Sequence, residues 1–210
     1  MPDQPRVPEQ RGFSLLEIMA VLAIAMIVTA MSGMMMMNLR NQYRLRTSTV
    51  DLSTLLQRAR MRAVRDNRNY QVVIDPLAQP LRVFVDLNKD GIWTQGAPGV
   101  TEDPVIQMQT GVTVQLGTSG AGNPTVPNST LGFTPQAAGA VVGFTARGTP
   151  CYVNGGGVCS SWDLTPKPVG FVYYVQSTSG AATILAAISI APSGRFQVWT
   201  YDRHTSTWGH

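Results

Sequence analysis

The chain has 210 residues, of which 44% are hydrophobic and 13% are charged, and its formal net charge is +4. This length accommodates one membrane segment and one globular domain of ordinary size, and it excludes more than two functional parts. The positive charge is concentrated in residues 40–68, which carry eight arginines against two aspartates, whereas the segments before and after are each close to neutral.

A long apolar run lies near the N-terminus. From Ile18 to Met37 there are 20 consecutive positions without a charged residue. At about 1.5 Å per residue, a helix of this length is sufficient to cross the bilayer core. One carboxylate, Glu17, lies at the start of the run. An ionisable group at the edge of a membrane segment is costly, so Glu17 is a candidate functional residue.

The residues before the run do not form an ordinary secretory signal, because the apolar core is too long and no small-residue cleavage pattern follows it. The sequence Arg11-Gly12-Phe13, followed by SLLE, instead resembles the class III signal of type IV prepilins and type II secretion pseudopilins. The resemblance implies that a membrane peptidase cuts between Gly12 and Phe13 on the cytoplasmic side and methylates the amino group of Phe13. Glu17 would then be the fifth residue of the mature chain. In a filament its carboxylate would face the amino terminus of a neighbouring subunit.

The same resemblance implies four segments: a cleaved leader at 1–12, a transmembrane and filament-core helix at 13–37, an amphipathic second half of that helix at 38–68, and a periplasmic β-rich domain at 69–210. The protein would be a single-pass protein of the bacterial inner membrane, incorporated into a periplasmic or extracellular filament. Its partners would be other pilins, the prepilin peptidase, the inner-membrane assembly platform and the lipid bilayer.

Two features depart from this pattern. The positive-inside tendency would place Arg40, Arg44 and Arg46 in the cytoplasm. We give the processing signal precedence, because the peptidase must reach Gly12 from the cytoplasm. The proline that bends the helix in many pilins is also absent, since residues 32–37 read SGMMMM. Gly33 lowers helix propensity, so a local bend and plain apolar packing both remain open.

Residues 38–68 contain no glycine or proline and predict a continuation of the helix, to roughly 55 residues in total. Apolar residues recur at spacings of three and four, at Leu52, Leu56, Ala59 and Ala63. The same stretch carries Arg58, Arg60, Arg62, Arg65 and Arg68. We interpret these arginines as a solvated face. Binding to anionic lipid or nucleic acid is the alternative, which the absence of interleaved aromatic residues disfavours.

Short β-type runs separated by turn residues follow from residue 70 onward. The expected strands are 70–74, 81–85, 105–108, 112–116, 141–144, 170–176, 183–190 and 196–201. Several alternate apolar and polar residues, as sheets with one buried face do. We expect residues 117–130 to be a mobile loop. The fold class is α+β, and the resemblance implies a pilin-like fold in which the long helix packs against an antiparallel sheet.

The C-terminal half narrows the resemblance. GFTARG at 143–148 and SIAPSGRFQVW at 189–199 are similar to the GspH/FimT group of minor pseudopilins and minor pilins. The implied function is that of a structural subunit that supports protein secretion or pilus assembly. The alternative is a minor pilin that acts as a DNA receptor in natural transformation. FimT-like DNA-binding proteins carry a basic GRxR motif, of which this chain keeps Arg195 and lacks the second arginine.

Two further candidates remain. Cys151 and Cys159 flank a glycine-rich loop, which predicts one disulfide, with two buried free thiols as the alternative. Asp86, Asn88 and Asp90 precede a glycine with the spacing of a calcium loop, although the expected glutamate at the twelfth position is absent. A plain β-hairpin turn explains the same residues.

Catalysis has little support in the sequence. The two histidines, His204 and His210, lie in the last seven residues, and no activated nucleophile accompanies them. We therefore expect a protein that is not an enzyme and has no cofactor, with a bound calcium ion as the alternative.

Overall fold

The computed structural model describes residues 14–96, 101–136, 141–153, 158–160, 169–179 and 182–210. Within the helix, the side chains of residues 30–35 and 38 lie outside this description. The chain divides into two compact units, Met1–Arg40 and Asn41–His210.

The long N-terminal helix predicted from the sequence is confirmed. Helix α1 runs from Leu15 to Arg65, which is 51 residues. Its first backbone hydrogen bonds run from Glu17 and Ile18 to the carbonyl of Ser14, at 3.0 and 3.3 Å. The backbone is helical through Gly33. The side chains of residues 30–35, where a bend was one alternative, lie outside the described residues.

The C-terminal end of α1 is fixed by a local turn. Asn67 has a φ of 51°, a left-handed conformation that asparagine tolerates. The backbone N–H of Arg68 then donates to the carbonyl of Ala63 at 3.1 Å. This hydrogen bond spans six residues and is the 6→1 bond of a Schellman motif. The motif satisfies a free carbonyl and turns the chain away from the helix axis.

The remaining elements of the described ranges are short strands of two to nine residues and one four-residue helix. The first strands are β1 Tyr70–Asp75, β2 Arg82–Asp86, β3 Val105–Gln107, β4 Val112–Leu116 and β5 Val141–Phe144. After them come β6 Pro150–Val153, β7 Cys159–Ser160, β8 Phe171–Ser179, β9 Ala182–Ile190, β10 Phe196–Asp202 and β11 Thr207–Gly209. The short helix α2, Asn128–Leu131, lies between β4 and β5.

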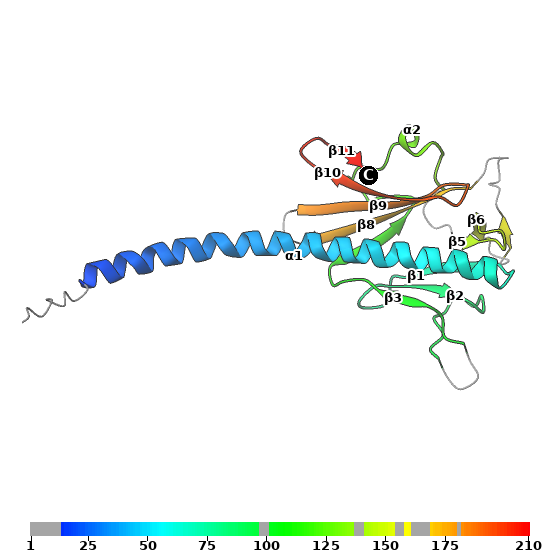
Figure 1. Ribbon diagram of the computed structural model, residues 1–210, viewed down its shortest axis with the longest axis horizontal. Coiled ribbons are helices and arrows are strands. Elements are labelled where there is room, and N and C mark those ends of the chain that lie inside the picture. The colour runs from blue at the N-terminus through cyan, green and yellow to red at the C-terminus, as the bar shows by residue number, and fades with distance from the viewer. Residues whose placement is uncertain (1–13, 97–100, 137–140, 154–157, 161–168, 180–181) are drawn as a thin grey trace, which may run out of the picture. The chain divides into compact units, whose positions relative to one another are not determined.

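The strands form two antiparallel sheets rather than one (Figure 1). The six-stranded sheet has the order β3-β2-β1-β5-β6-β7, and the five-stranded sheet has the order β11-β10-β9-β8-β4. All eight predicted strands are present, with ends that differ by a few residues. The sequence did not predict β6, β7, β11 or α2, because these segments of four residues or fewer lack the adjacent β-branched residues that mark the equally short β3 and β5.

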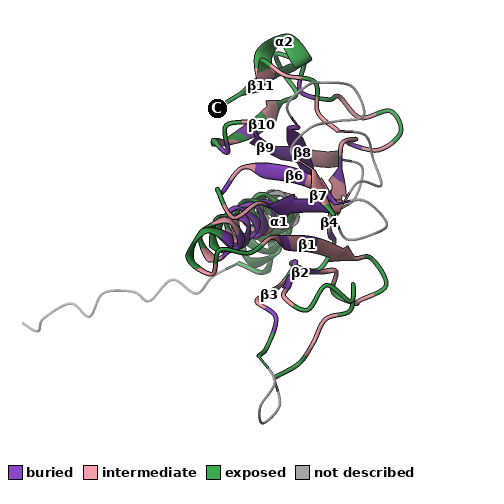
Figure 2. Cartoon of the chain, turned by 90° about the vertical axis from the view of Figure 1, so that its right-hand side faces the viewer, coloured by how far each residue is buried: buried purple, intermediate pink, exposed green. Residues whose placement is uncertain are grey.

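The α1 segment from Asn41 onward packs against both sheets. Figure 2 shows the strands on one side of the helix, with buried residues between them. The predicted stripe is fully buried, since Leu52, Leu56, Ala59 and Ala63 are each at most 1% exposed. These side chains join residues of both sheets in one hydrophobic core. The helix therefore holds the two sheets together through burial of apolar area.

The five-stranded sheet has a second buried face. Val172, Tyr174 and Trp199 point away from the main core and form a smaller cluster with Val126. The backbone N–H of Val126 donates to the Tyr174 hydroxyl at 3.0 Å. The segment 117–130, expected to be a mobile loop, thus covers this face instead of extending freely. Burial on both faces explains why β8 and β9 have near-continuous apolar sequences.

Candidate functional site

The first unit consists of an apolar helical surface without buried large side chains among its described residues. From Leu15 to Val28, the large apolar residues are between 52% and 78% exposed: Leu15, Leu16, Ile18, Met19, Val21, Leu22, Ile24, Met26, Ile27 and Val28. They occupy all sides of the helix. A helix that is apolar all round is normally buried in a protein core or in a membrane. This surface is therefore suited to packing against another apolar partner.

Glu17 is the only charged side chain between Leu15 and Leu39. It is exposed in the first turn of α1, where the helix dipole favours a negative charge. Within the described residues, its carboxylate has no hydrogen-bond or ion-pair partner. The Thr29 hydroxyl, in contrast, donates to the Ala25 carbonyl at 2.6 Å and so is satisfied within the helix. Glu17 thus remains free to pair with a cation from outside the helix.

A comparison with protein-family models identifies the same stretch. Residues 8–33 match a family described as the prokaryotic N-terminal methylation motif. The chain carries this methylation motif. The match supports the resemblance to type IV pilins and pseudopilins, and it implies processing by a prepilin peptidase and assembly with other pilins. No curated protein and no solved structure matches the chain significantly.

The methylation motif covers the predicted cleavage site. Gly12 and Phe13 themselves lie outside the described residues, so cleavage and methylation stay predictions. In the described part of the chain, no helix is both long and apolar enough to cross a membrane.

The two C-terminal segments that carry the GspH/FimT resemblance, 143–148 and 189–199, lie close together beside one arginine of α1. Gly148, in the turn between β5 and β6, and Gly194, in the turn between β9 and β10, have φ angles of 75° and 82°. Arg60 of α1 donates from Nη1 to the Gly194 carbonyl at 2.8 Å. A Cβ at Gly194 would lie 2.8 Å from the Gly148 carbonyl oxygen and 3.1 Å from the Arg60 guanidinium. Arg60 is thus a structural residue that fixes the Gly194 turn on the helix and lies beside the Gly148 turn, a role that the sequence did not reveal.

A second cluster lies at the C-terminal end of α1. Asp66 forms ion pairs with Arg65 at 2.8 Å and with Arg62 at 3.4 Å. It also accepts a hydrogen bond from the Tyr70 hydroxyl at 2.9 Å. The hydrogen bond from Arg65, followed by that from Tyr70, lowers the pKa of Asp66 to about 2. The carboxylate therefore ties the helix end to the start of β1.

This cluster predicts a pH dependence. Because the folded-state pKa of Asp66 is about 2, below its ordinary value of 3.8, its contribution to stability is present above the ordinary pKa. That contribution is lost as the pH falls towards about 2. We expect Asp66→Asn to unfold more easily in urea than the unmodified chain at neutral pH. The difference should vanish in strong acid, and a difference independent of pH would contradict the role of the charge.

The candidate calcium loop follows β2. Asp86 is fully buried, and its Oδ1 accepts from the Lys89 backbone N–H at 2.6 Å. Its Oδ2 accepts from the Gly91 N–H at 2.7 Å and from the Gln71 side-chain amide. Buried Asp103 likewise accepts from two backbone N–H groups, those of Leu87 and Thr94. Both buried carboxylates are thus compensated by donors of the chain itself.

The other two predicted ligands behave as turn residues. Asn88 accepts from the Asp90 N–H at 3.3 Å and donates to the Asp90 carboxylate at 2.8 Å. Asp90 accepts from the Ile92 N–H at 2.7 Å. No cluster of three His, Cys, Asp or Glu residues able to hold a metal occurs in the described ranges. Calcium binding stays a hypothesis, supported if a chelator lowers the melting temperature and removed if it does not.

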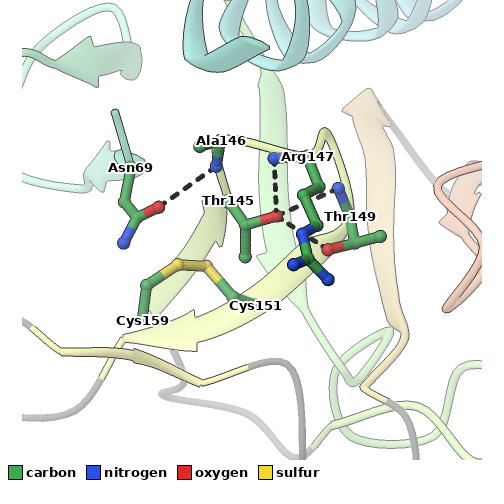
Figure 3. The surroundings of a disulfide bond; sticks show 7 residues. All are labelled: Asn69, Thr145, Ala146, Arg147, Thr149, Cys151 and Cys159. Carbon is green, nitrogen blue, oxygen red and sulfur yellow. Dashed lines mark hydrogen bonds between the residues drawn. A yellow bond between two sulfur atoms is a disulfide. The ribbon is translucent and has the colours of Figure 1, made fainter. Parts of the chain in front are cut away.

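Cys151 and Cys159 form a disulfide with a Cα–Cα distance of 5.4 Å. Figure 3 shows it beside the turn that connects β5 to β6. In this turn the Thr145 and Thr149 hydroxyls are 2.7 Å apart, and the Ala146 N–H donates to the Asn69 side chain at 3.2 Å. Cys151 is fully buried. The disulfide thus links the edge strand β7 to its neighbour β6. The turn that precedes β6 is held in place by the hydrogen bonds described above.

Removal of this disulfide should destabilise the second unit. Closure of the short loop between the two cysteines restricts the unfolded chain, which corresponds to roughly 2.5 kcal/mol in the chain-entropy treatment. We expect Cys159→Ser, with Cys151→Ser in the same chain, to lower the free energy of unfolding by about this amount in urea titrations. The unmodified chain under reducing conditions is the matched control, and equal stability of that chain with and without reductant would contradict the prediction.

Arg195 and the histidines lie apart from these clusters. Arg195 is exposed and donates from Nη2 to the Gln197 side chain at 3.1 Å. Asp202 accepts from the backbone N–H of His204 at 2.8 Å, which lowers the pKa of the carboxyl. The His210 ring contacts Trp199, with centroids 5.1 Å apart. The structure does not bring Asp202 and a histidine ring together with a nucleophile among the described residues.

Proposed function

We propose that this chain is a minor pseudopilin or minor pilin that co-assembles through its N-terminal helix into a type II secretion pseudopilus or a type IV pilus. Its role would be structural rather than enzymatic, and it would support protein secretion. In this proposal the precursor is held in the inner membrane, with the β-rich unit in the periplasm.

The observation that carries the proposal is the combination at the start of α1. The methylation motif, a helix whose large apolar side chains are exposed from Leu15 to Val28, and a single carboxylate without a described partner occur in one stretch. An apolar helix surface of this kind is buried in a bundle of identical or related helices. In such a bundle, a neighbour's amino terminus would neutralise Glu17. The GspH/FimT assignment rests only on the sequence similarity of segments 143–148 and 189–199.

Mass spectrometry of the membrane-bound protein tests the processing step. We expect co-expression with an active prepilin peptidase to give a chain that begins at Phe13 and carries one methyl group. A peptidase with an inactivating substitution is the control, and it should leave Met1 at the N-terminus. A chain that retains residues 1–12 in the presence of the active peptidase would overturn the proposal.

A DNA receptor in natural transformation is the alternative proposal. It rests on exposed arginines, among which Arg58 and Arg68 have no hydrogen-bond or ion-pair partner within the described residues. A gel shift with DNA and the full chain distinguishes the two functions: a shift would support the DNA receptor, and no shift would leave the structural role alone. The salt concentration is kept moderate because binding to phosphates is strongly salt-dependent.

A further inference from the structure

The outward-facing side of the last turns of α1 is bordered by two grooves. One, of about 310 Å³, lies between the helix and Val85 of β2. The other, of about 450 Å³, lies between the helix and Phe196 of β10. Met61 and Arg65 line both grooves, so they form a ridge between them. We call the surface made by Arg58, Met61, Val64 and Arg65 the Met61 ridge.

The ridge exposes apolar side chains on the last turns of α1. Met61 is 63% exposed and Val64 is 50% exposed. Their neighbours on the opposite side of the helix, Ala59 and Ala63, are buried in the core. Phe196, which lines the larger groove, is only partly buried. A partner that covers the ridge would therefore remove adjoining apolar area from water without rearrangement of the helix.

The ridge also has an excess of positive charge. Among the described residues, Asp66 is the one carboxylate that pairs with arginines here, and it already serves both Arg62 and Arg65. Arg58 lines the smaller groove and has no hydrogen-bond or ion-pair partner in the described part of the chain. An exposed guanidinium can take a carboxylate in a bidentate, charge-assisted pair. The charge that would complement this surface is negative.

The combination favours a protein partner over nucleic acid. In single-stranded nucleic-acid sites, cations along the backbone groove alternate with aromatic rings on which bases stack. Here methionine and valine separate the guanidinium groups, and Phe196 supplies the only aromatic ring that the described residues contribute to the two grooves. Methionine and arginine are enriched in the centres of protein interfaces. We propose that the Met61 ridge binds a segment of a partner protein that presents apolar side chains flanked by carboxylates.

Fluorescence anisotropy with the full chain in detergent micelles tests the proposal. The probe is a labelled peptide of repeated Glu-Glu-Leu-Leu units, with protein-free micelles as the blank. We expect Arg58→Glu and Met61→Ser each to weaken binding by about tenfold, since each removes a central contact of the interface. Arg46→Glu is the matched control on the same helix, because Arg46 lines neither of these grooves. It should change the affinity less than about twofold.

Four outcomes would overturn the proposal. They are no binding of the peptide at millimolar protein, equal weakening by Arg46→Glu, equal affinity for a peptide with glutamine in place of glutamate, and tighter binding of a DNA duplex with the same dependence on Arg58. Circular dichroism of each variant is the control that tests whether its fold is intact. The result is independent of filament assembly, because Glu17 and the methylation motif lie outside this surface.

Discussion

The Glu17→Ala variant is expected to insert into the membrane and to be processed normally. The fraction of the chain that enters filaments should be at least about tenfold lower than for the unmodified chain. The physical reason is that the substitution would remove one partner of the ion pair proposed for the filament, which would leave a buried amino terminus uncompensated at a cost of about 3–5 kcal/mol. The measurement is the fraction of the chain in the sheared or pelleted filament relative to the membrane, in a host that has the assembly machinery.

Two further variants make this experiment specific. Glu17→Gln keeps the size of the side chain and removes its charge, so it should show a loss similar to that of Glu17→Ala. Thr29→Ala is the matched control in the same unit, because the Thr29 hydroxyl is already bonded within the helix. Normal incorporation of Glu17→Gln would show that the charge of Glu17 has no role in assembly.

Gly194→Ala is expected to destabilise the second unit by about 2–5 kcal/mol. Two effects add: an L-residue in the left-handed region costs about 1–2 kcal/mol, and overpacking costs about 1–3 kcal/mol. The new Cβ would lie 2.8 Å from the backbone oxygen of Gly148, which cannot move as a flexible side chain can. Urea denaturation of the full chain in detergent, followed by tryptophan fluorescence, measures the change.

Gly122→Ala separates these two effects. Gly122 has a φ of 80°, close to the 82° of Gly194, but a Cβ added there would meet no atom within 4 Å. We expect this variant to lose only the left-handed contribution, about 1–2 kcal/mol. If the two variants were equally destabilised, the close approach of the two turns over Arg60 would not contribute to stability.

Much of the fold could be predicted, because its signals are local. The absence of glycine and proline from residues 38–68 and the spacing of Leu52, Leu56, Ala59 and Ala63 predict the buried face of α1, which the structure confirms. Val50, an apolar residue two positions before Leu52, is 56% exposed instead. A spacing of three and four identifies a face, but only the position of the sheets decides how wide the buried part of that face is.

The candidate sites divide in the same way. The calcium spacing of Asp86, Asn88 and Asp90 could be recognised from the sequence, but the donors that satisfy Asp86 could not. The Gln71 amide comes from the neighbouring strand β1, so its contact with Asp86 depends on the pairing of β1 with β2. Contacts between side chains of neighbouring strands depend on which strands pair and in which register, and a local pattern such as Asp86, Asn88 and Asp90 contains neither.

The sequence by itself identified the N-terminal methylation motif of this protein. The signal around Gly12 and Phe13, the position of Glu17 and the uncharged run after it are contiguous in the chain, so their meaning does not depend on how the rest folds. Only the tertiary structure decided that the strands form two sheets, that residues 117–130 cover one of them, and that Arg60 joins the turns of Gly148 and Gly194. These contacts join residues far apart in sequence, and burial of the shared apolar core brings them together.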